Sequence, residues 1–417
     1  MSSPTTIVAR RAPWRTPIVI LVCGCLISML GFGPRATFGF FLFPMSNANG
    51  WAREVFALAL AMQALLWGAA QPFAGALADR FGAMRVLCAG AVVYSLGLAA
   101  MAHSSTPGAL YLSAGVLIGF GLAGSSFTLV IGAFGALMPR EWRSRAFGAG
   151  TAAGSFGQFL FSPLAVALID AFGWRTTLET FGGLVLVIVP LSLALAPPER
   201  KAPRERDTTT ITAKQTLMQA LAEAFGHGSY LLLVLGFFTC GFQLFFITVH
   251  LPAYLIDRGL SAELAGWTIA TIGLFNIVGA VLSGWLASRV PNRLILSGIY
   301  FARALAMAIF IAVPPSAAAT LIFGAVTGLL WLSTVPPTSA LVAIMFGTRW
   351  LTTLFGFAFF SHQVGGFLGV WLGGFLFART GSYDVIWWLS ILLGLLSALI
   401  NLPIVEKPAP RLAAAAA

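Results

Sequence analysis

The sequence predicts an all-α membrane protein with twelve transmembrane helices in two pseudo-symmetric six-helix bundles. Three observations support this fold class: an apolar composition, twelve long apolar segments and a polar motif that occurs twice. Of the 417 residues, 59% are hydrophobic and only 9% are charged, whereas soluble globular proteins carry about 25% charged residues. A water-soluble core of this size has no room for so many apolar residues, so the predicted solvent is a bilayer.

Each predicted span is a segment of roughly 20 or more predominantly apolar residues. The first six spans are 17–42, 53–77, 84–103, 108–137, 144–170 and 174–196. The last six are 229–256, 262–287, 292–313, 316–346, 350–378 and 381–404. The tenth contains Pro336 and Pro337, so we expect it to be kinked or tilted.

The basic residues test the number and orientation of these spans. Eighteen of the 24 Lys and Arg residues fall in the termini and loops on one side, and four fall on the other side. The remaining two, Arg35 and Arg303, lie inside spans. Because cytoplasmic loops carry an excess of Lys and Arg, this asymmetry predicts cytoplasmic N- and C-termini. It also argues against a nucleic-acid-binding patch, since the charges alternate between loops.

The segment between the sixth and seventh spans divides the chain. We predict an N-terminal six-helix bundle in 1–196, a cytoplasmic linker in 197–228 and a C-terminal six-helix bundle in 229–417. The first part of the linker is rich in Pro, Thr and charged residues. Its second part, 213–226, carries Leu217, Leu221 and Phe225 at four-residue steps, which predicts an amphipathic surface helix.

A short polar motif connects the second and third spans. It contains Gly75, Asp79, Arg80, Gly82 and Arg85, and a weaker copy 209 residues later retains Gly284 and Arg289 but has Ser288 in place of the aspartate. A glycine allows two helices to approach closely, and Asp79 is suited to pair with a basic group or a helix N-terminus of the other bundle. We therefore predict a gating motif here, and a repeat of this kind is one transporter architecture.

Twelve spans in two halves with this loop motif resemble the major facilitator superfamily, in which the loop acts as a cytoplasmic latch for one state. Finer motifs look like those of bacterial relatives of monocarboxylate transporters and oxalate/formate exchangers. These motifs are Arg35–Leu42 ahead of Gly50-Trp51, Ile299–Ala306, Val335–Ser339, Ser361–Gly365, and Gly381–Tyr383 ahead of Trp387-Trp388. One difference concerns the eighth span, where that family commonly has an arginine for the substrate carboxylate and this chain has Ala280.

Charged residues inside spans are costly, so each is a candidate for function. Arg35, in the outer half of the first span, is a candidate to bind an anionic carboxylate in place of the missing arginine of the eighth span. Its alternative is a structural role, snorkelling or bonding to helix-end carbonyls. By the plan that the resemblance implies, the ninth span is peripheral, so Arg303 is expected to serve structure or coupling. None of the 13 acids lies in the middle of a span, which leaves a histidine or the substrate itself to carry any coupled proton.

Further polar residues in the spans define a candidate substrate cavity. His362 is either a hydrogen-bond donor or proton site in the cavity, or a packing residue. His250 and Gln243 share one helix face with Thr239 and Tyr254, which is either a cavity wall or a packing stripe. The complete predicted substrate-binding set is Arg35, Gln158, Gln243, His250, Asn276, Trp331, His362 and Gln363.

The function predicted from the sequence is secondary transport, with no enzymatic activity. We expect a small organic anion, most simply a monocarboxylate, to move by rocking of the two halves, with or without a proton. The alternative is a neutral or drug-like solute, which the missing arginine and the aromatic-rich interior favour. We expect no cofactor, no metal and no nucleic-acid partner. The predicted protein is a monomer in the lipid bilayer of a bacterial inner membrane.

Overall fold

A computed structural model describes residues 14–196, 215–347 and 350–409, and this part of the chain contains only helices, turns and loops. We call residues 14–196 the N-terminal half and residues 215–409 the C-terminal half. The helices of the N-terminal half are α1 (Pro17–Ala36), η1 (Phe38–Phe41), α2 (Leu42–Asn49), α3 (Arg53–Phe81), α4 (Ala83–Ala102), α5 (Pro107–Leu110), η2 (Tyr111–Leu117), α6 (Ile118–Gly124), α7 (Phe127–Leu137), α8 (Arg140–Leu186), α9 (Ile188–Ser192) and η3 (Leu193–Leu195). The helices of the C-terminal half are α10 (Leu217–Phe225), α11 (Gly228–Asp257), α12 (Ala262–Leu286), α13 (Asn292–Ala312), α14 (Ala317–Leu330), α15 (Val335–Phe346), α16 (Leu351–Thr380) and α17 (Asp384–Asn401).

The described residues form eleven helical segments that are long and apolar enough to cross a membrane. One of them runs for 55 residues from Glu141 to Leu195, far more than the roughly 20 residues that one crossing needs. It breaks at Gly173, where φ is 79°, a conformation that glycine adopts without a steric penalty. The fifth and sixth predicted spans therefore meet at this glycine, and the fold has twelve spans.

Two spans are broken near their middle. The fourth is interrupted at Ser125 and Ser126, between α6 and α7. The tenth is interrupted between Leu330 and Val335, directly before Pro336 and Pro337, so the predicted kink is confirmed. Each break leaves backbone groups without helical partners, and in a membrane such groups need partners inside the protein.

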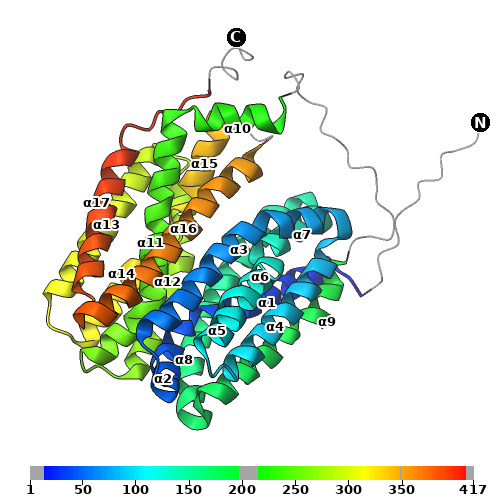
Figure 1. Ribbon diagram of the computed structural model, residues 1–417. Helices are drawn as coiled ribbons and strands as arrows, with labels where there is room; N and C mark the ends of the chain where they lie inside the picture. Colours follow the sequence, from blue (N-terminus) through cyan, green and yellow to red (C-terminus); the bar gives the residue numbers. More distant parts are fainter. Residues whose placement is uncertain (1–13, 197–214, 348–349, 410–417) are drawn as a thin grey trace, which may run out of the picture.

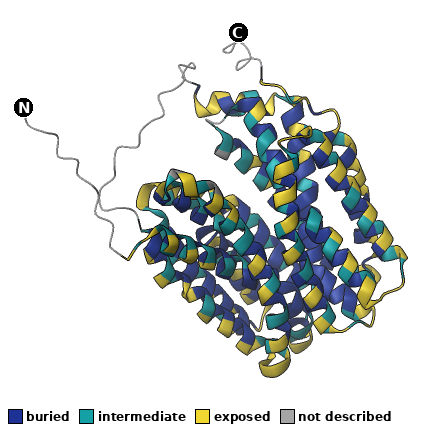
Figure 2. Cartoon of the chain, turned by 180° about the vertical axis from the view of Figure 1, so that it is seen from behind, coloured by how far each residue is buried: buried dark blue, intermediate teal, exposed yellow. Residues whose placement is uncertain are grey.

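The two halves pack mainly through α3 with α16 and α8 with α12, and α11 also contacts η1 and α2. In Figure 1 the ribbons of the halves meet near α2 and diverge toward the end of the bundle that carries α10. We call that end the linker face. We call the other end, which carries loops 50–52, 258–261 and 381–383 and the kink at Gly173, the loop face. Buried residues concentrate where the halves meet, as Figure 2 shows.

Within the C-terminal half, α11 packs most extensively on α16. A Cβ added to Gly365 would lie 2.0 Å from the Phe238 carbonyl oxygen, and one added to Gly369 would lie 2.3 Å from that of Phe242. Any larger side chain at either position would separate the two helices. The glycines of the eleventh span therefore permit backbone-to-backbone contact, as in other membrane helix pairs.

The predicted amphipathic helix is present as α10 at the linker face. Thr216 caps it, because the Thr216 side chain accepts from the Gln219 amide and the Gln219 side chain accepts from the Thr216 amide. Such a capping box satisfies two orphan donors at a helix start. The preceding part of the predicted linker, 197–214, lies outside the described residues.

Candidate functional site

Arg35 is the buried charge closest to the junction of the two halves. It lies in the last turn of α1 and is only 7% exposed. Its guanidinium carbon lies 5.9 Å from the ring centre of Phe32, 5.1 Å from that of Trp67 and 4.2 Å from that of Phe245. Phe245 belongs to α11, so this cation contacts both halves. Face contacts with aromatic rings compensate part of the cost of burying the charge.

The Arg35 guanidinium has no ion pair among the described residues, and its Nε has no hydrogen-bond partner there. Buried charges in proteins are normally paired or fully hydrogen-bonded. A guanidinium presents a planar fork of donors that matches the two oxygens of a carboxylate. Arg35 thus offers an unused anion-binding group at the centre of the molecule.

His362 and Gln363 lie beside this cation on α16. The Phe245 ring contacts both groups, with its centre 4.2 Å from the Arg35 guanidinium carbon and 5.8 Å from the His362 ring centre. His362 Nδ1 lies 3.1 Å from Gln363 Oε1, and Gln363 Nε2 donates to the Ala64 carbonyl of α3 at 3.1 Å. Of the predicted site residues, Arg35, His362 and Gln363 therefore lie close together.

Gln158 and Asn276 join the halves on the other side of the interface. Gln158 Nε2 donates to the Ile269 carbonyl at 3.2 Å, and Asn276 Nδ2 donates to Ser155 Oγ at 2.9 Å. Asn276 Oδ1 also accepts from the Leu332 amide at 3.0 Å, inside the break between α14 and α15. Both side chains thus hold the interface in this conformation, and Asn276 ties it to the break where Trp331 also lies.

Gln243 and His250 face away from this centre. Gln243 Nε2 donates to the Ser390 carbonyl of α17 at 2.9 Å. The His250 ring nitrogens lie 2.8 Å from the Val370 carbonyl oxygen and 3.2 Å from the Tyr383 hydroxyl. These contacts fit the packing stripe rather than the cavity wall, and we leave both residues out of the candidate site.

Arg303, on α13, donates hydrogen bonds to backbone carbonyl groups at the break between α14 and α15. Its side chain is 1% exposed and donates to the carbonyl groups of Leu330 and Trp331, while Nη1 lies 3.3 Å from Cys240 Sγ. Helical partners for these carbonyls are lost where α14 ends. The arginine replaces those partners, and we therefore interpret Arg303 as a structural residue.

Replacing Arg303 by methionine should therefore destabilise the protein. The carbonyls of Leu330 and Trp331 would lose their donor inside the membrane, a loss of about 1–3 kcal/mol. Thermal unfolding in detergent measures the effect, with Arg258→Met, which removes an exposed arginine, as the matched control. An unfolding temperature equal to that of the control would contradict the structural role.

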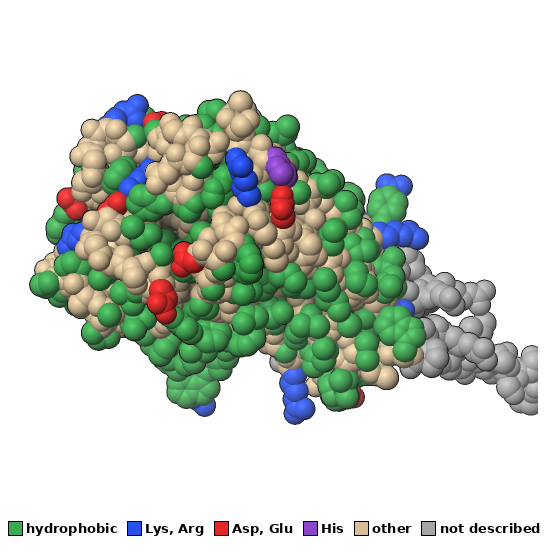
Figure 3. Space-filling model, turned by 90° about the horizontal axis from the view of Figure 1, so that it is seen from below, with side chains coloured by type: hydrophobic (Ala, Val, Ile, Leu, Met, Phe, Trp, Pro, Cys, Tyr) green, Lys and Arg blue, Asp and Glu red, His purple; other side chains and the backbone are tan. Residues whose placement is uncertain are grey.

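An ion-pair network that was not predicted from the sequence lies at the loop face. Arg53 donates to both Asp257 oxygens, at 2.6 and 2.8 Å, and to the Tyr383 hydroxyl at 3.2 Å. Glu54, the next residue, lies 3.5 Å from Arg379. Burial raises the pKa of Tyr383 to about 12, so its hydroxyl stays protonated. Each half supplies one cation and one anion, so the two pairs fasten the halves together. Figure 3 shows this face, with charged side chains scattered among polar and apolar ones.

The predicted gating motif lies at the linker face, where its charged side chains have no hydrogen bond or ion pair with the described residues of the other half. Asp79, Arg80 and Arg85 are exposed, and Asp79 has no ion pair among the described residues. Gly82 has φ of 90°, which fits its place in the turn between α3 and α4. In the second copy, Arg289 stacks on the Trp285 ring at 3.8 Å.

Four glycines show that the interface helices separate toward the linker face. A Cβ added to Gly68 would lie 2.6 Å from Gln363, and one added to Gly273 would lie 2.8 Å from the Ser155 carbonyl oxygen. Four other glycines lie on the same sides of these helices, two or three turns nearer the linker face. A Cβ added to any of them would meet nothing within 4 Å. These positions are Gly75 on α3, Gly148 on α8, Gly284 on α12 and Gly356 on α16.

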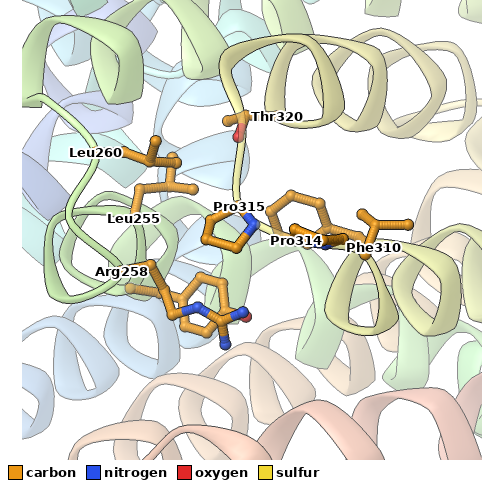
Figure 4. A pocket seen from close by; sticks show the side chains of 9 residues that line it. Leu255, Arg258, Leu260, Phe310, Pro314, Pro315 and Thr320 are labelled. Carbon is orange, nitrogen blue, oxygen red and sulfur yellow. The ribbon is translucent and has the colours of Figure 1, made fainter.

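A small pocket at the loop face is not a candidate for substrate. Tyr254, Arg258, Phe310 and the loop before α14 line it. Figure 4 labels Arg258, Phe310 and the loop residues Pro314 and Pro315. Its volume of about 10 Å³ is room for about one water molecule.

Known proteins resemble this chain along most of its length. The family model of the Major Facilitator Superfamily matches residues 21–370. An uncharacterized MFS-type transporter of Bacillus subtilis (strain 168), YcxA, is 28% identical over 387 residues, which cover 89% of this chain and 91% of that protein. Human monocarboxylate transporter 11 is 28% identical over 355 residues, 80% of this chain and 70% of that protein. A solved structure of a bacterial homolog of the human lysosomal transporter Spinster superimposes with a TM-score of 0.75 at 14% identity, covering 94% of this chain and 97% of that one.

Proposed function

Because this chain belongs to the major facilitator superfamily, we propose that it is a secondary active transporter of a small organic anion, most simply a monocarboxylate. The observation that carries the substrate class is Arg35, a buried guanidinium with no ion pair among the described residues. The named monocarboxylate transporters among its relatives support the same class. A single anionic group on the substrate would complete the pairing that the protein itself leaves open.

The proposed site lies between Arg35 of the N-terminal half and His362 of the C-terminal half. Trp67 and Phe245 contact the guanidinium, and Phe359 stacks on His362 at 5.8 Å. In this arrangement the substrate carboxylate binds Arg35, and its apolar part lies against the aromatic rings. His362 is the proposed proton site if transport is proton-coupled, since no acid lies in the middle of a span.

The structure has the features of one end state of a transport cycle. Ion pairs fasten the halves at the loop face, and open space separates Gly75, Gly148, Gly284 and Gly356 from other atoms at the linker face. The excess of Lys and Arg in the linker-face loops supports a cytoplasmic linker face. We therefore assign the conformation as open to the cytoplasm of a bacterial inner membrane, in a protein that works as a monomer.

The proposed cycle closes the linker face by extending contacts that already exist. Gly75 lies seven residues after Gly68 on α3, and Gly356 lies seven residues before Gln363 on α16, so continuing the observed register brings the two glycines together. In the same way, Gly148 lies eleven residues before Phe159, and Gly284 lies eleven residues after Gly273. Seven or eleven residues return to nearly the same side of a helix. Rocking of the halves about the site would exchange the loop-face ion pairs for these glycine contacts.

Counterflow in proteoliposomes tests the proposed function. Vesicles containing the purified protein are loaded with an unlabelled carboxylate, and entry of the same labelled compound is followed for small monocarboxylates, dicarboxylates and neutral analogues. We expect accelerated entry of at least one monocarboxylate and none of its amide. Indifference to every carboxylate, together with entry of a neutral compound, would overturn the assignment.

A neutral or drug-like solute remains the second candidate, and the aromatic surroundings of Arg35 favour it. Phe32, Trp67 and Phe245 offer apolar surface to a solute without charge. The two candidates differ in their need for the guanidinium. Transport of a neutral solute that survives Arg35→Ala would favour this alternative.

Reversing one charge of the loop-face network should open that face. Arg53→Asp places two carboxylates together, and we expect an Ala57→Cys reporter, buried in the parent protein, to react about five- to tenfold faster with an impermeant maleimide. The exchanged pair Arg53→Asp with Asp257→Arg should restore the slow rate. Equal rates in the single and exchanged variants would show that the pair does not hold this face closed.

A further inference from the structure

The C-terminal half carries a groove of about 320 Å³ between α12, α13 and the break after α14. Leu282 and Ser283 line it from α12, Leu294 and Gly298 from α13, and Leu330 and Ser333 from the break. It is separate from the proposed substrate site, which lies where the two halves meet.

The groove faces the membrane and not the other half. Leu282 lies nine residues after Gly273, which places it on the opposite side of α12, and Gly273 packs on the N-terminal half. Leu282 is 49% exposed and Leu294 is 46% exposed. Both helices belong to predicted membrane spans, so lipid surrounds the opening.

The groove lining calls for an apolar occupant. The hydroxyl groups of its two serines are already used, since Ser283 donates to the Ser333 carbonyl and Ser333 donates to the Leu329 carbonyl at 2.6 Å. The other named lining residues are aliphatic or glycine. A solute with hydrogen-bonding groups would lose partners on entering, whereas a hydrocarbon chain would not.

A basic rim lies at the linker-face end of the groove. Val290 and Leu294 line this end, and Arg289 lies beside Val290 in the turn between α12 and α13. Arg289 is exposed and stacks on Trp285, with no ion pair among the described residues. Arg293 donates from its side chain to the Leu402 carbonyl at 3.2 Å, and its backbone amide donates to the Glu406 carboxylate at 2.8 Å, so Arg289 is the basic residue free to bind an anion here. Basic pockets between membrane helices bind anionic lipid head groups.

We propose that this groove binds one acyl chain of an anionic phospholipid, whose phosphate binds Arg289. The chain would lie against Leu330 and Ser333, on the membrane side of the break between α14 and α15. Arg303 donates to the Leu330 and Trp331 carbonyls of the same break. A bound lipid would thus stabilise the break on its membrane side, while Arg303 and Asn276 stabilise it from the protein interior.

Photo-crosslinking tests the lipid site. The purified protein is reconstituted with phosphatidylglycerol that carries a diazirine on one acyl chain, irradiated, and digested to locate labelled peptides. Gly298→Phe fills the groove, because a Cβ added there meets nothing within 4 Å. Gly298→Ala leaves the groove open, and Gly183→Phe adds the same ring at an exposed glycine elsewhere.

We expect labelling of α12 and α13 peptides that falls about fivefold in Gly298→Phe and is unchanged in Gly298→Ala and Gly183→Phe. Arg289→Ala should reduce labelling by phosphatidylglycerol about fivefold, the effect of one basic residue near an anionic head group. It should leave labelling by the phosphatidylcholine analogue unchanged. Labelling spread evenly over the membrane surface, or equal in Gly298→Phe and wild type, would overturn the site. An Arg289→Ala protein that keeps its preference for phosphatidylglycerol would overturn the head-group assignment.

Discussion

Replacing Arg35 by alanine is expected to reduce carboxylate uptake about 10- to 100-fold. A hydrogen bond between charged groups contributes about 1.5–3 kcal/mol, and the substrate carboxylate would be left without a cation in a buried site. The variant also removes contacts with Trp67 and Phe245, so its folding must be checked by thermal unfolding. Initial uptake rates in proteoliposomes measure the loss.

Two further variants separate charge from shape at this position. Arg35→Lys keeps the positive charge but lacks the planar fork, so we expect intermediate uptake. Arg258→Ala removes an exposed arginine at the loop face and should leave uptake near the wild-type rate. Wild-type uptake by the folded Arg35→Ala protein would contradict the assigned role of Arg35.

A disulfide between positions 75 and 356, or between 148 and 284, is expected to reduce the transport rate more than tenfold. In the open conformation a Cβ added to any of these four glycines would meet no atom within 4 Å. Only the state closed at the linker face brings each pair within the roughly 4.4–6.8 Å between Cα atoms that a disulfide requires. Gly75→Cys with Gly356→Cys should therefore trap that state under oxidation, and reduction should restore uptake.

The mismatched pair Gly75→Cys with Gly284→Cys is the control, because α3 and α12 belong to different contact pairs of the interface. We expect it to form disulfide much more slowly than either matched pair. Equal rates for matched and mismatched pairs would mean that the register seen near the loop face does not extend to the linker face.

The sequence predicted the spans and the break in the tenth span well, because the length needed to cross the hydrocarbon layer and the effect of proline on a helix are local constraints. The break in the fourth span, at Ser125 and Ser126, was not predicted, since no proline marks it. The predicted start of the eleventh span at 350 and end of the seventh at 256 lie within a residue of Leu351 and Asp257. The proline pair after Thr334 marked the broken tenth span for the same reason, since proline removes a helical donor.

Side-chain direction could not be predicted where a helix is buried on every side. In the most apolar stretch of α11, 78% of the residues are buried, so periodicity does not show which neighbour Gln243 and His250 face. Both contact α16 or α17. Their helix spacing was visible in the sequence, but the element packed against that face was not.

The loop-face network was missed for a different reason. Arg53 and Asp257 are 204 residues apart, and charged residues at span ends are common because they meet water or lipid head groups there. Opposite charge at two such ends is a weak signal until the packing of the halves is known. Glu54 follows Arg53 in the sequence and lies near Arg379. This second pair, too, can be recognised only once the packing of the halves is known.

The most direct test of the central claim is a double-mutant cycle between Arg35 and the carboxylate of the substrate. Binding of the best monocarboxylate and of its neutral amide is measured by titration calorimetry with wild-type protein and with Arg35→Ala. We predict a coupling energy of about 1.5–3 kcal/mol, because the carboxylate gains affinity only when the guanidinium is present. A coupling energy near zero, with the acid and the amide weakened equally by the substitution, would contradict carboxylate binding by Arg35.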